Sequence, residues 1–170
     1  MERGVTFRGM NKRRATILLQ GVVVLAGIGA LVLLLWEPHL EGRNAHATLF
    51  EIYFKDPFLA YLYLASIAFF VALFRAFTLL GYIRQDKAFS LESIKALRTI
   101  KYCGMTLVAM IGAAVAYLFI AVRGSDDIAG GVAMGLLIIF VSIAIATAAA
   151  MFERRLQDAV DMKSDRVNAP

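Results

Sequence analysis

The chain alternates between four long apolar runs and shorter segments that carry most of its charges. A helix that crosses a bilayer needs about 20 mostly apolar residues at a rise of about 1.5 Å each, and every run reaches that length. The runs do not alternate apolar with polar positions, and they are longer than the roughly ten-residue strands of membrane barrels. The sequence therefore predicts four transmembrane helices, at residues 15–36, 58–83, 101–122 and 128–152.

The remaining segments connect these predicted spans. We expect a basic leader before the first span, an outer loop at residues 37–57, an inner loop at 84–100 and a tail at 153–170. The link between the third and fourth spans is so short that these two helices should be antiparallel neighbours. The predicted fold class is an all-α membrane protein, a single domain over residues 1–170 built as an antiparallel four-helix transmembrane bundle.

Local signals mark several helix ends. Asp56 and Pro57 suit the N-cap and the first position of the second span. Ser90 is a good N-cap, and the apolar spacing after it predicts an amphipathic cytoplasmic helix that leads into the third span. After Phe152 we expect one or two further turns of amphipathic helix, followed by irregular chain from Ser164 onward.

Positive charge is distributed unevenly about the spans. Fifteen of the 18 lysines and arginines lie on the side of the leader, the inner loop and the tail. Cationic residues accumulate on the cytoplasmic side of membranes, so both termini should be cytoplasmic. The net charge of +5 then reflects topology, and we expect no nucleic-acid partner. A cleaved signal peptide is the rival interpretation of the first run, which exceeds the usual apolar length of about 7–15 residues.

Arg75 is a charged residue well inside a predicted span. An arginine at depth is costly unless it reaches headgroups or a polar partner. Counted along the helices from the same side, Gln20, Thr106 and Thr147 fall at a similar depth. Two interpretations remain open: an intramembrane polar cluster of these four residues that binds a lipid headgroup or another anion, and a lone arginine that snorkels to the cytoplasmic headgroups.

Small residues recur on helix faces where membrane helices pack closely. The fourth span carries Gly131 and Gly135 in G-x-x-x-G spacing, and the third carries Gly112 and Ala116. Such residues allow backbones to approach, so we predict that these four take part in helix packing. Packing within the bundle and packing in a homo-oligomer both remain open.

Residues suited to chemistry are scarce. No Asp, Glu or His lies inside a predicted span, and no nucleophile elbow, phosphate-binding loop or dinucleotide motif occurs. His39 and His46 form only a weak candidate metal site, because their spacing matches no metal motif. Cys103, the one cysteine, suits a packed thiol or juxtamembrane acylation. We therefore expect a protein that is not an enzyme and that has no metal and no cofactor.

Several stretches are specific enough to compare with a known family. They are FVALFRAFTLLGYI at residues 70–83, KAFS at 87–90, SIKALRTIKYC at 93–103 and the region 154–164 that ends in DMKS. In them the chain resembles a bacterial membrane family catalogued as domain of unknown function 2975. The resemblance covers roughly residues 12–165 and implies a four-span protein of the bacterial cytoplasmic membrane. It implies no catalytic residue, and the pairing of members with small helix-turn-helix regulators implies a regulatory role.

These features favour a structural, regulatory or partner-binding membrane protein. Its expected partners are the lipid bilayer and a cytoplasmic regulatory protein. The candidate cytoplasmic interaction face is the cationic line of Lys95, Arg98 and Lys101. The alternative is a small transporter or channel subunit, which would need a water-accessible path that the small-residue faces argue against.

Overall fold

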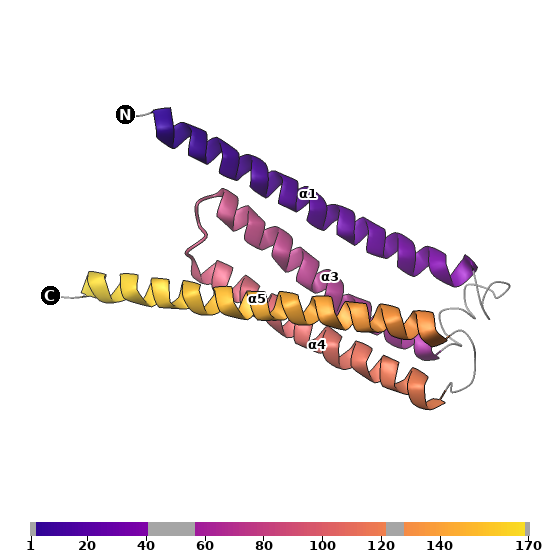
Figure 1. Ribbon diagram of the computed structural model, residues 1–170. Coiled ribbons are helices and arrows are strands. Elements are labelled where there is room, and N and C mark those ends of the chain that lie inside the picture. The colour runs from indigo at the N-terminus through magenta and orange to yellow at the C-terminus, as the bar shows by residue number, and fades with distance from the viewer. Residues whose placement is uncertain (1–2, 41–56, 122–127, 169–170) are drawn as a thin grey trace.

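The computed structural model describes residues 3–40, 57–121 and 128–168, which are helical except for the turn at 85–90. The helices are α1 (Arg3–Leu40), α3 (Pro57–Arg84), α4 (Leu91–Ala121) and α5 (Ile128–Asn168) (Figure 1). All four are long and apolar enough to cross a membrane. The predicted all-helical fold with four candidate spans is therefore confirmed.

Two helices are longer than the sequence suggested. Helix α1 begins at Arg3, within the expected leader. Helix α5 continues to Asn168, so the prediction of irregular chain from Ser164 is wrong. The residues after Phe152 are mostly good helix formers, and no glycine or proline follows until the end of the chain, so nothing stops the helix. Most of the predicted outer loop lies outside the described residues.

A tight turn reverses the chain between α3 and α4. The Lys87 amide donates to the Tyr82 carbonyl over 2.9 Å. Asp86 has φ 57°, in the left-handed region that Asp tolerates better than most residues. The Ser93 amide donates to Ser90 Oγ over 3.3 Å, which confirms Ser90 as the N-cap of α4. The amphipathic segment and the third span are thus one continuous helix.

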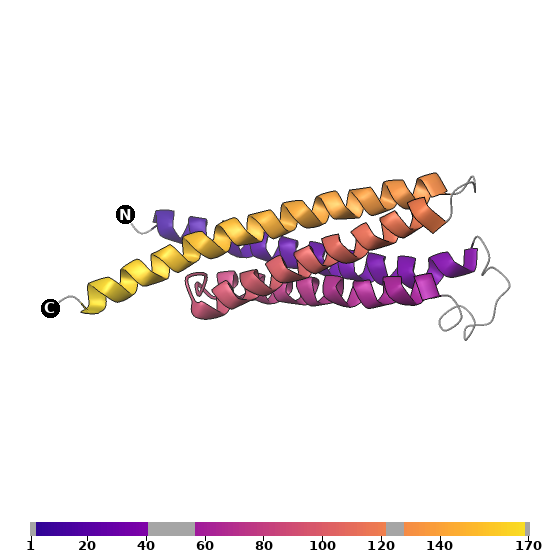
Figure 2. The same ribbon diagram turned by 90° about the horizontal axis from the view of Figure 1, so that it is seen from below.

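The helices pack in chain order: α1 on α3, α3 on α4 and α4 on α5. Figures 1 and 2 show α1 and α5 on different sides of the α3–α4 pair. The N-terminus, the C-terminus and the α3–α4 turn lie at the same end of the molecule (Figure 1). We call this end, which carries the turn at 85–90, the polar end.

Side-chain hydrogen bonds join the described parts of α1 and α3. Gln20, which is buried, donates from Nε2 to the Phe77 carbonyl over 3.4 Å. Tyr63 donates its hydroxyl to the Leu34 carbonyl over 2.6 Å. Polar groups of this kind hold membrane helices together where lipid removes the hydrophobic drive for association. Helix α1 otherwise presents mostly exposed apolar side chains.

The closest packing lies along a seam between α4 and α5. Seam residues recur at spacings of three and four, the pattern of knobs-into-holes packing. An added Cβ at Gly104 would lie 3.0 Å from Ala146 Cβ, so these backbones are close. The buried residues with contacts across the seam are Leu97, Ile100, Gly104, Ile111 and Val115 on α4, and Gly135, Ser142, Ala146, Ala149 and Glu153 on α5.

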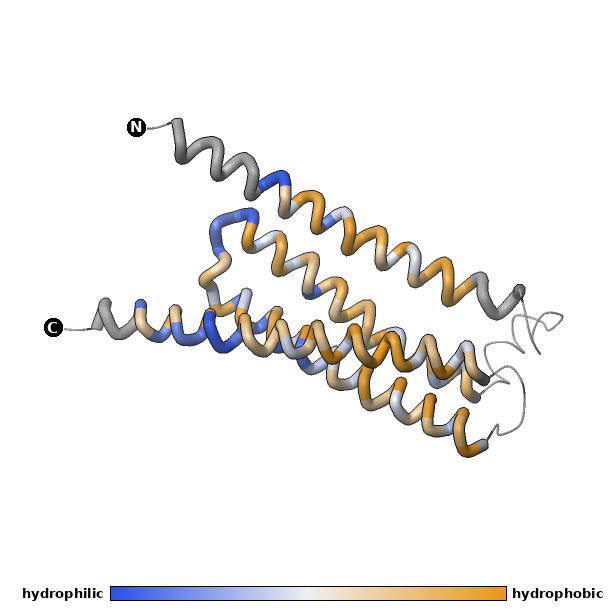
Figure 3. The backbone as a smooth tube through the Cα atoms, in the orientation of Figure 1, coloured by the Kyte–Doolittle hydropathy of each residue, from blue (hydrophilic) through white to orange (hydrophobic). Residues whose placement is uncertain are grey.

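Much of the outer surface is apolar. Leu18, Ile120 and Phe140 are each more than two thirds exposed, at 71%, 80% and 72%. Hydrophilic residues gather at the polar end, while the rest of the helices is largely hydrophobic (Figure 3). Soluble proteins rarely expose apolar surface on this scale, so the helices are suited to a lipid environment.

Candidate functional site

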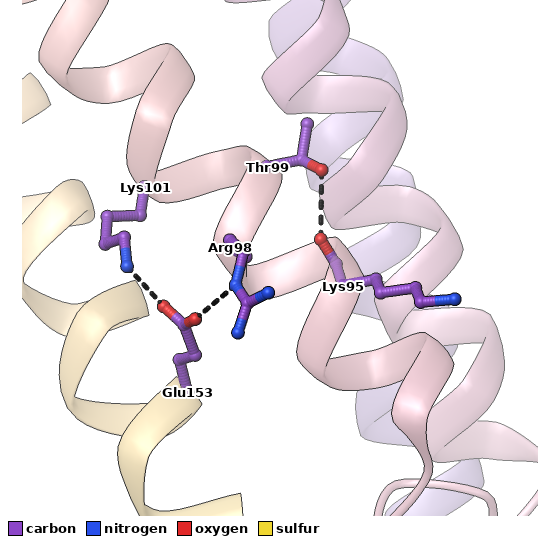
Figure 4. A network of polar contacts seen from close by, with 5 residues as sticks. All are labelled: Lys95, Arg98, Thr99, Lys101 and Glu153. Atoms are coloured by element: carbon purple, nitrogen blue, oxygen red, sulfur yellow. Dashed lines mark hydrogen bonds and ion pairs between the residues drawn. The ribbon is translucent and has the colours of Figure 1, made fainter. Parts of the chain in front are cut away.

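A buried carboxylate, that of Glu153, lies in the seam between α4 and α5. Its side chain is 7% exposed. Arg98 donates from Nε to Oε1 of Glu153 over 2.7 Å, and Lys101 donates from Nζ to Oε2 over 2.6 Å (Figure 4). Each carboxylate oxygen therefore has its own charged donor. We call these three residues the Glu153 network.

The Glu153 network offsets the cost of burying a charge. Removing a carboxylate from water costs several kcal/mol, which only close, charge-assisted hydrogen bonds recover. Arg98 and Lys101 are three residues apart on α4, so both reach the same point on α5 from one helix face. The Lys101 ammonium also lies 5.0 Å from the centroid of the Tyr102 ring. The network ties α4 to α5 where the apolar run of α5 ends at Phe152.

The predicted cationic face of Lys95, Arg98 and Lys101 separates into two parts. Arg98 and Lys101 are engaged with Glu153, although 48% and 24% of their side chains remain exposed. Lys95 is exposed, and its side chain points away from Glu153 (Figure 4). Its carbonyl accepts a hydrogen bond from Thr99 Oγ1 over 2.9 Å. Lys95 is thus the member of the face that Glu153 does not engage, and its charge is directed outward.

The proposed intramembrane polar cluster is not assembled within the chain. Arg75 and Thr147 are exposed. Gln20 instead bonds the Phe77 carbonyl, and Thr106 donates to the Tyr102 carbonyl of its own helix over 3.0 Å. Phe77 lies two residues from Arg75, about 200° around α3, so Gln20 approaches a different face.

Arg75 lies nine residues before the end of α3, at the level of a packed cluster on α4 and α5. The next residue, Ala76, packs against the cluster that contains Ile100 and Ala149. Ile100 adjoins Lys101, and Ala149 lies one turn before Glu153. Arg75 is therefore at about the same level as the Glu153 network, a position that favours a headgroup contact over a buried cluster.

Of the four residues predicted to take part in helix packing, two face α4 or α5 across the seam and two do not. An added Cβ at Gly135 would lie 2.5 Å from Val115 Cγ2, and one at Gly131 would lie 3.5 Å from Leu118 Cδ1. These two glycines therefore face α4. An added Cβ at Gly112 would meet nothing within 4 Å, and Ala116 is exposed. Gly112 and Ala116 thus lie off the seam, and packing within the chain does not use them.

Sequence reasoning missed the two residues that define the seam most sharply. Gly104 sits against the Ser142 carbonyl and Ala146, and Glu153 bonds both cations. A usable signal was present, because Glu153 follows Ala146 by seven residues and therefore lies on the same face of α5. Extending that spacing past the apolar run would have placed this carboxylate opposite α4.

Exposed apolar side chains also occur among the charges of the polar end. Phe89 and Leu91, on either side of the Ser90 cap, are 71% and 61% exposed. Met162, near the end of α5, is 63% exposed. Phe89 and Leu91 lie between Lys87 and the exposed Glu92, outside the apolar runs, so they form a small apolar surface within a charged segment.

The described residues offer no metal centre. Among them, no group of three or more His, Cys, Asp and Glu residues could hold an ion. The side chains of His39 and His46, the weak candidate pair, lie outside the described residues. Cys103 is a free cysteine of intermediate burial.

Comparison with known proteins places the chain in a family. The family described as "Protein of unknown function (DUF2975)" matches residues 42–166. The uncharacterized membrane protein YoaS of Bacillus subtilis is 39% identical over 154 residues, which cover 90% of this chain and 96% of that protein. No solved structure matches the chain. On this evidence the chain is a member of the DUF2975 family and is similar to a bacterial membrane protein.

Proposed function

We propose that this membrane protein is a non-catalytic regulatory subunit that presents a docking surface for a cytoplasmic protein. The proposed docking surface comprises Phe89, Leu91 and Lys95, at the start of α4. The proposed arrangement is an antiparallel four-helix bundle in the bacterial cytoplasmic membrane, with both termini and the α3–α4 turn in the cytoplasm.

The charge distribution supports this orientation. The chain termini and the α3–α4 turn share one end of the molecule, and most lysines and arginines belong to the segments that meet there. Such residues are retained on the cytoplasmic side during insertion. The relative from Bacillus subtilis, a membrane protein by its name, supports a bacterial setting.

The observation that carries the docking proposal is the exposure of Phe89 and Leu91 beside outward-facing charge. Large apolar side chains at the centre of a polar rim are typical anchors of protein interfaces. Lys95 lies one turn after Leu91 on α4, and its charge is directed outward (Figure 4). The partner that fits this surface offers an apolar pocket flanked by acidic residues.

The docking surface is also supported on a rigid base. Ser93, fully buried, donates its hydroxyl to the Lys87 carbonyl over 3.2 Å and fixes the turn to α4. The Glu153 network fixes α4 to α5 about two turns further along. A surface held in place in this way loses little conformational freedom when it binds.

Cross-linking in native membranes tests this proposal. The tagged full chain is cross-linked in its own bacterium, and proteins captured by the wild type and by variants are compared quantitatively. Phe89→Ala and Lys95→Glu should each reduce capture of the same cytoplasmic protein about tenfold, because anchors and complementary charges carry much of the binding energy. Arg155→Glu, the same charge reversal at an exposed position of α5, is the matched control and should leave capture unchanged. Equal capture by all variants would refute the docking surface.

The alternative of a small transporter or channel subunit has less support. A conducting path must run between helices, and α4 and α5 approach so closely at Gly104 and Gly135 that no path can pass between them. Ion flux through the purified chain in vesicles would favour the alternative.

A further inference from the structure

We propose that the outer flank of the α4–α5 pair binds an anionic phospholipid, whose phosphate is held by Arg98 and Arg154. The lipid chains would lie along α4 below Arg98, over Met105 and Gly112. This site is separate from the proposed docking surface and does not depend on it.

The first observation is the unused half of the Arg98 guanidinium. Arg98 bonds Glu153 through Nε alone. Among the described residues neither of its terminal nitrogens forms a hydrogen bond, and nearly half of its side chain is exposed. A planar guanidinium recognises phosphate oxygens with such paired donors. Buried Glu153 therefore acts as a positioning residue that holds the free edge of Arg98 outward.

The second observation is an excess of positive charge around Glu153. Arg98 and Lys101 contribute two cations, and the single carboxylate balances one of them. Arg154 follows Glu153 directly and is exposed. Because Glu153 faces α4, a rotation of about 100° places Arg154 on a flank of the same contact. An anionic ligand would neutralise this excess.

The third observation indicates a lipid rather than a soluble anion. Below Arg98, toward the apolar part of α4, Met105 and Gly112 follow at successive steps of seven residues and share its helix face. Met105 is 57% exposed, and Gly112 has open space where a side chain would be. Ala109 and Ala116, on neighbouring positions, are exposed as well. A phosphate above a shallow apolar track matches the layout of a phospholipid.

A lipid at this site would contact residues that packing within the chain leaves unused. Gly112 and Ala116 form no part of the seam, and their small side chains leave a shallow surface directly below the cations. The cations lie where the apolar run of α5 ends, which is where a bilayer places its phosphates.

Native mass spectrometry of the purified full chain tests the lipid site. The protein is exchanged into detergent with equal amounts of phosphatidylglycerol and phosphatidylcholine, and retained lipid is measured for each variant. The wild type should retain phosphatidylglycerol in preference to phosphatidylcholine. Arg154→Gln leaves the Glu153 network intact. Arg98→Lys keeps a cation that can bond Glu153 but removes the terminal guanidinium nitrogens that would bind the phosphate. Each should reduce retained phosphatidylglycerol about fivefold, the scale expected for a partly exposed ion pair.

The matched control is Lys95→Gln, which removes one exposed cation from the same helix outside the proposed site. It should retain phosphatidylglycerol like the wild type. Equal losses in all three variants would indicate a general charge effect and overturn the site. Equal retention of both lipids would also overturn it. If inorganic phosphate raised the thermal stability as much as phosphatidylglycerol does, the ligand would be a soluble anion, and the lipid site would be overturned.

Discussion

Glu153 occupies a seam position of the kind that small and apolar side chains fill elsewhere on α5. Small residues such as Ala146 and Ala149 allow close approach but do little to fix one register along the helices. A buried carboxylate is more selective, because it is satisfied only where Arg98 and Lys101 stand opposite. At the residue scale, the Glu153 network therefore selects one alignment of α4 against α5.

Replacing Glu153 with Gln tests the energetic part of this argument. The variant keeps the side-chain shape and removes the charge that Arg98 and Lys101 bond. We expect the free energy of unfolding to fall by about 1–2 kcal/mol, since one partner is half exposed and screened by solvent. Denaturant titration of the full chain in micelles, followed by circular dichroism, measures the change.

The matched control for this prediction is Asp158→Asn on the exposed part of α5. It makes the same chemical change away from the network, and its effect should stay below about 0.5 kcal/mol. Equal destabilisation by the two variants would show that the loss of negative charge matters and that the network does not.

Arg75 shows what a count along the helices can and cannot predict. Counting gave Gln20, Thr106 and Thr147 a depth similar to that of Arg75, but depth does not fix direction around a helix. Direction depends on which faces meet neighbouring helices, and that follows from packing of the whole chain. Gln20 faces α3 at Phe77, whereas Arg75 is exposed, so the four side chains point to different surroundings.

The starts of the helices could be predicted from the sequence, but the helix faces that pack together could be predicted only in part. Pro57 and Ser90 mark helix starts through chemistry within a few residues, and α3 and α4 begin at Pro57 and Leu91. The choice between Gly104 and Gly112 as a contact on α4 could not be made locally, because both are small residues in an apolar helix. The partner helix decides, and α5 meets Gly104.

Substitutions of Gly135 and Gly112 test whether α4 and α5 pack closely along the seam. Gly135→Ala brings a Cβ within 2.5 Å of Val115 Cγ2, and valine has little rotameric freedom to withdraw. We expect a loss of about 1–3 kcal/mol in unfolding free energy. Gly112→Ala meets nothing within 4 Å, and it should keep or raise stability because alanine favours helix over glycine by about 1 kcal/mol.

A compensating substitution separates crowding from other effects at Gly135. Val115→Ala removes the atom that the new Cβ would meet, so the double variant should regain much of the lost stability. Thermal unfolding in micelles compares the wild type, Gly135→Ala, Gly112→Ala and the double variant of Gly135→Ala with Val115→Ala. Indistinguishable stability of Gly135→Ala and Gly112→Ala would contradict the close approach of α4 and α5.

At the scale of the whole molecule, the fold combines a tightly joined part and a looser one. Helices α4 and α5 share a buried seam and an ion network, whereas the described part of α1 is mostly exposed and meets α3 at contacts such as Gln20 with Phe77 and Tyr63 with Leu34. Local hydropathy indicated four spans without indicating this inequality, because exposed apolar residues on α1 resemble those on the other helices. The difference in packing between α4–α5 and α1–α3 depends on which small and polar residues face one another across each pair of helices.

Thiol accessibility in intact cells tests the orientation of the whole molecule. In a Cys103→Ser background, which removes the one native thiol, single cysteines are introduced by Lys95→Cys and Ala129→Cys, both at exposed positions. A maleimide that does not cross membranes should label Ala129→Cys in cells whose cytoplasmic membrane it can reach. It should label Lys95→Cys only after the cells are opened. Under the proposed orientation the positively charged polar end stays in the cytoplasm, so Lys95 and Ala129, at opposite ends of the helices, are expected to face opposite compartments. Labelling of Lys95→Cys alone in intact cells would reverse the orientation.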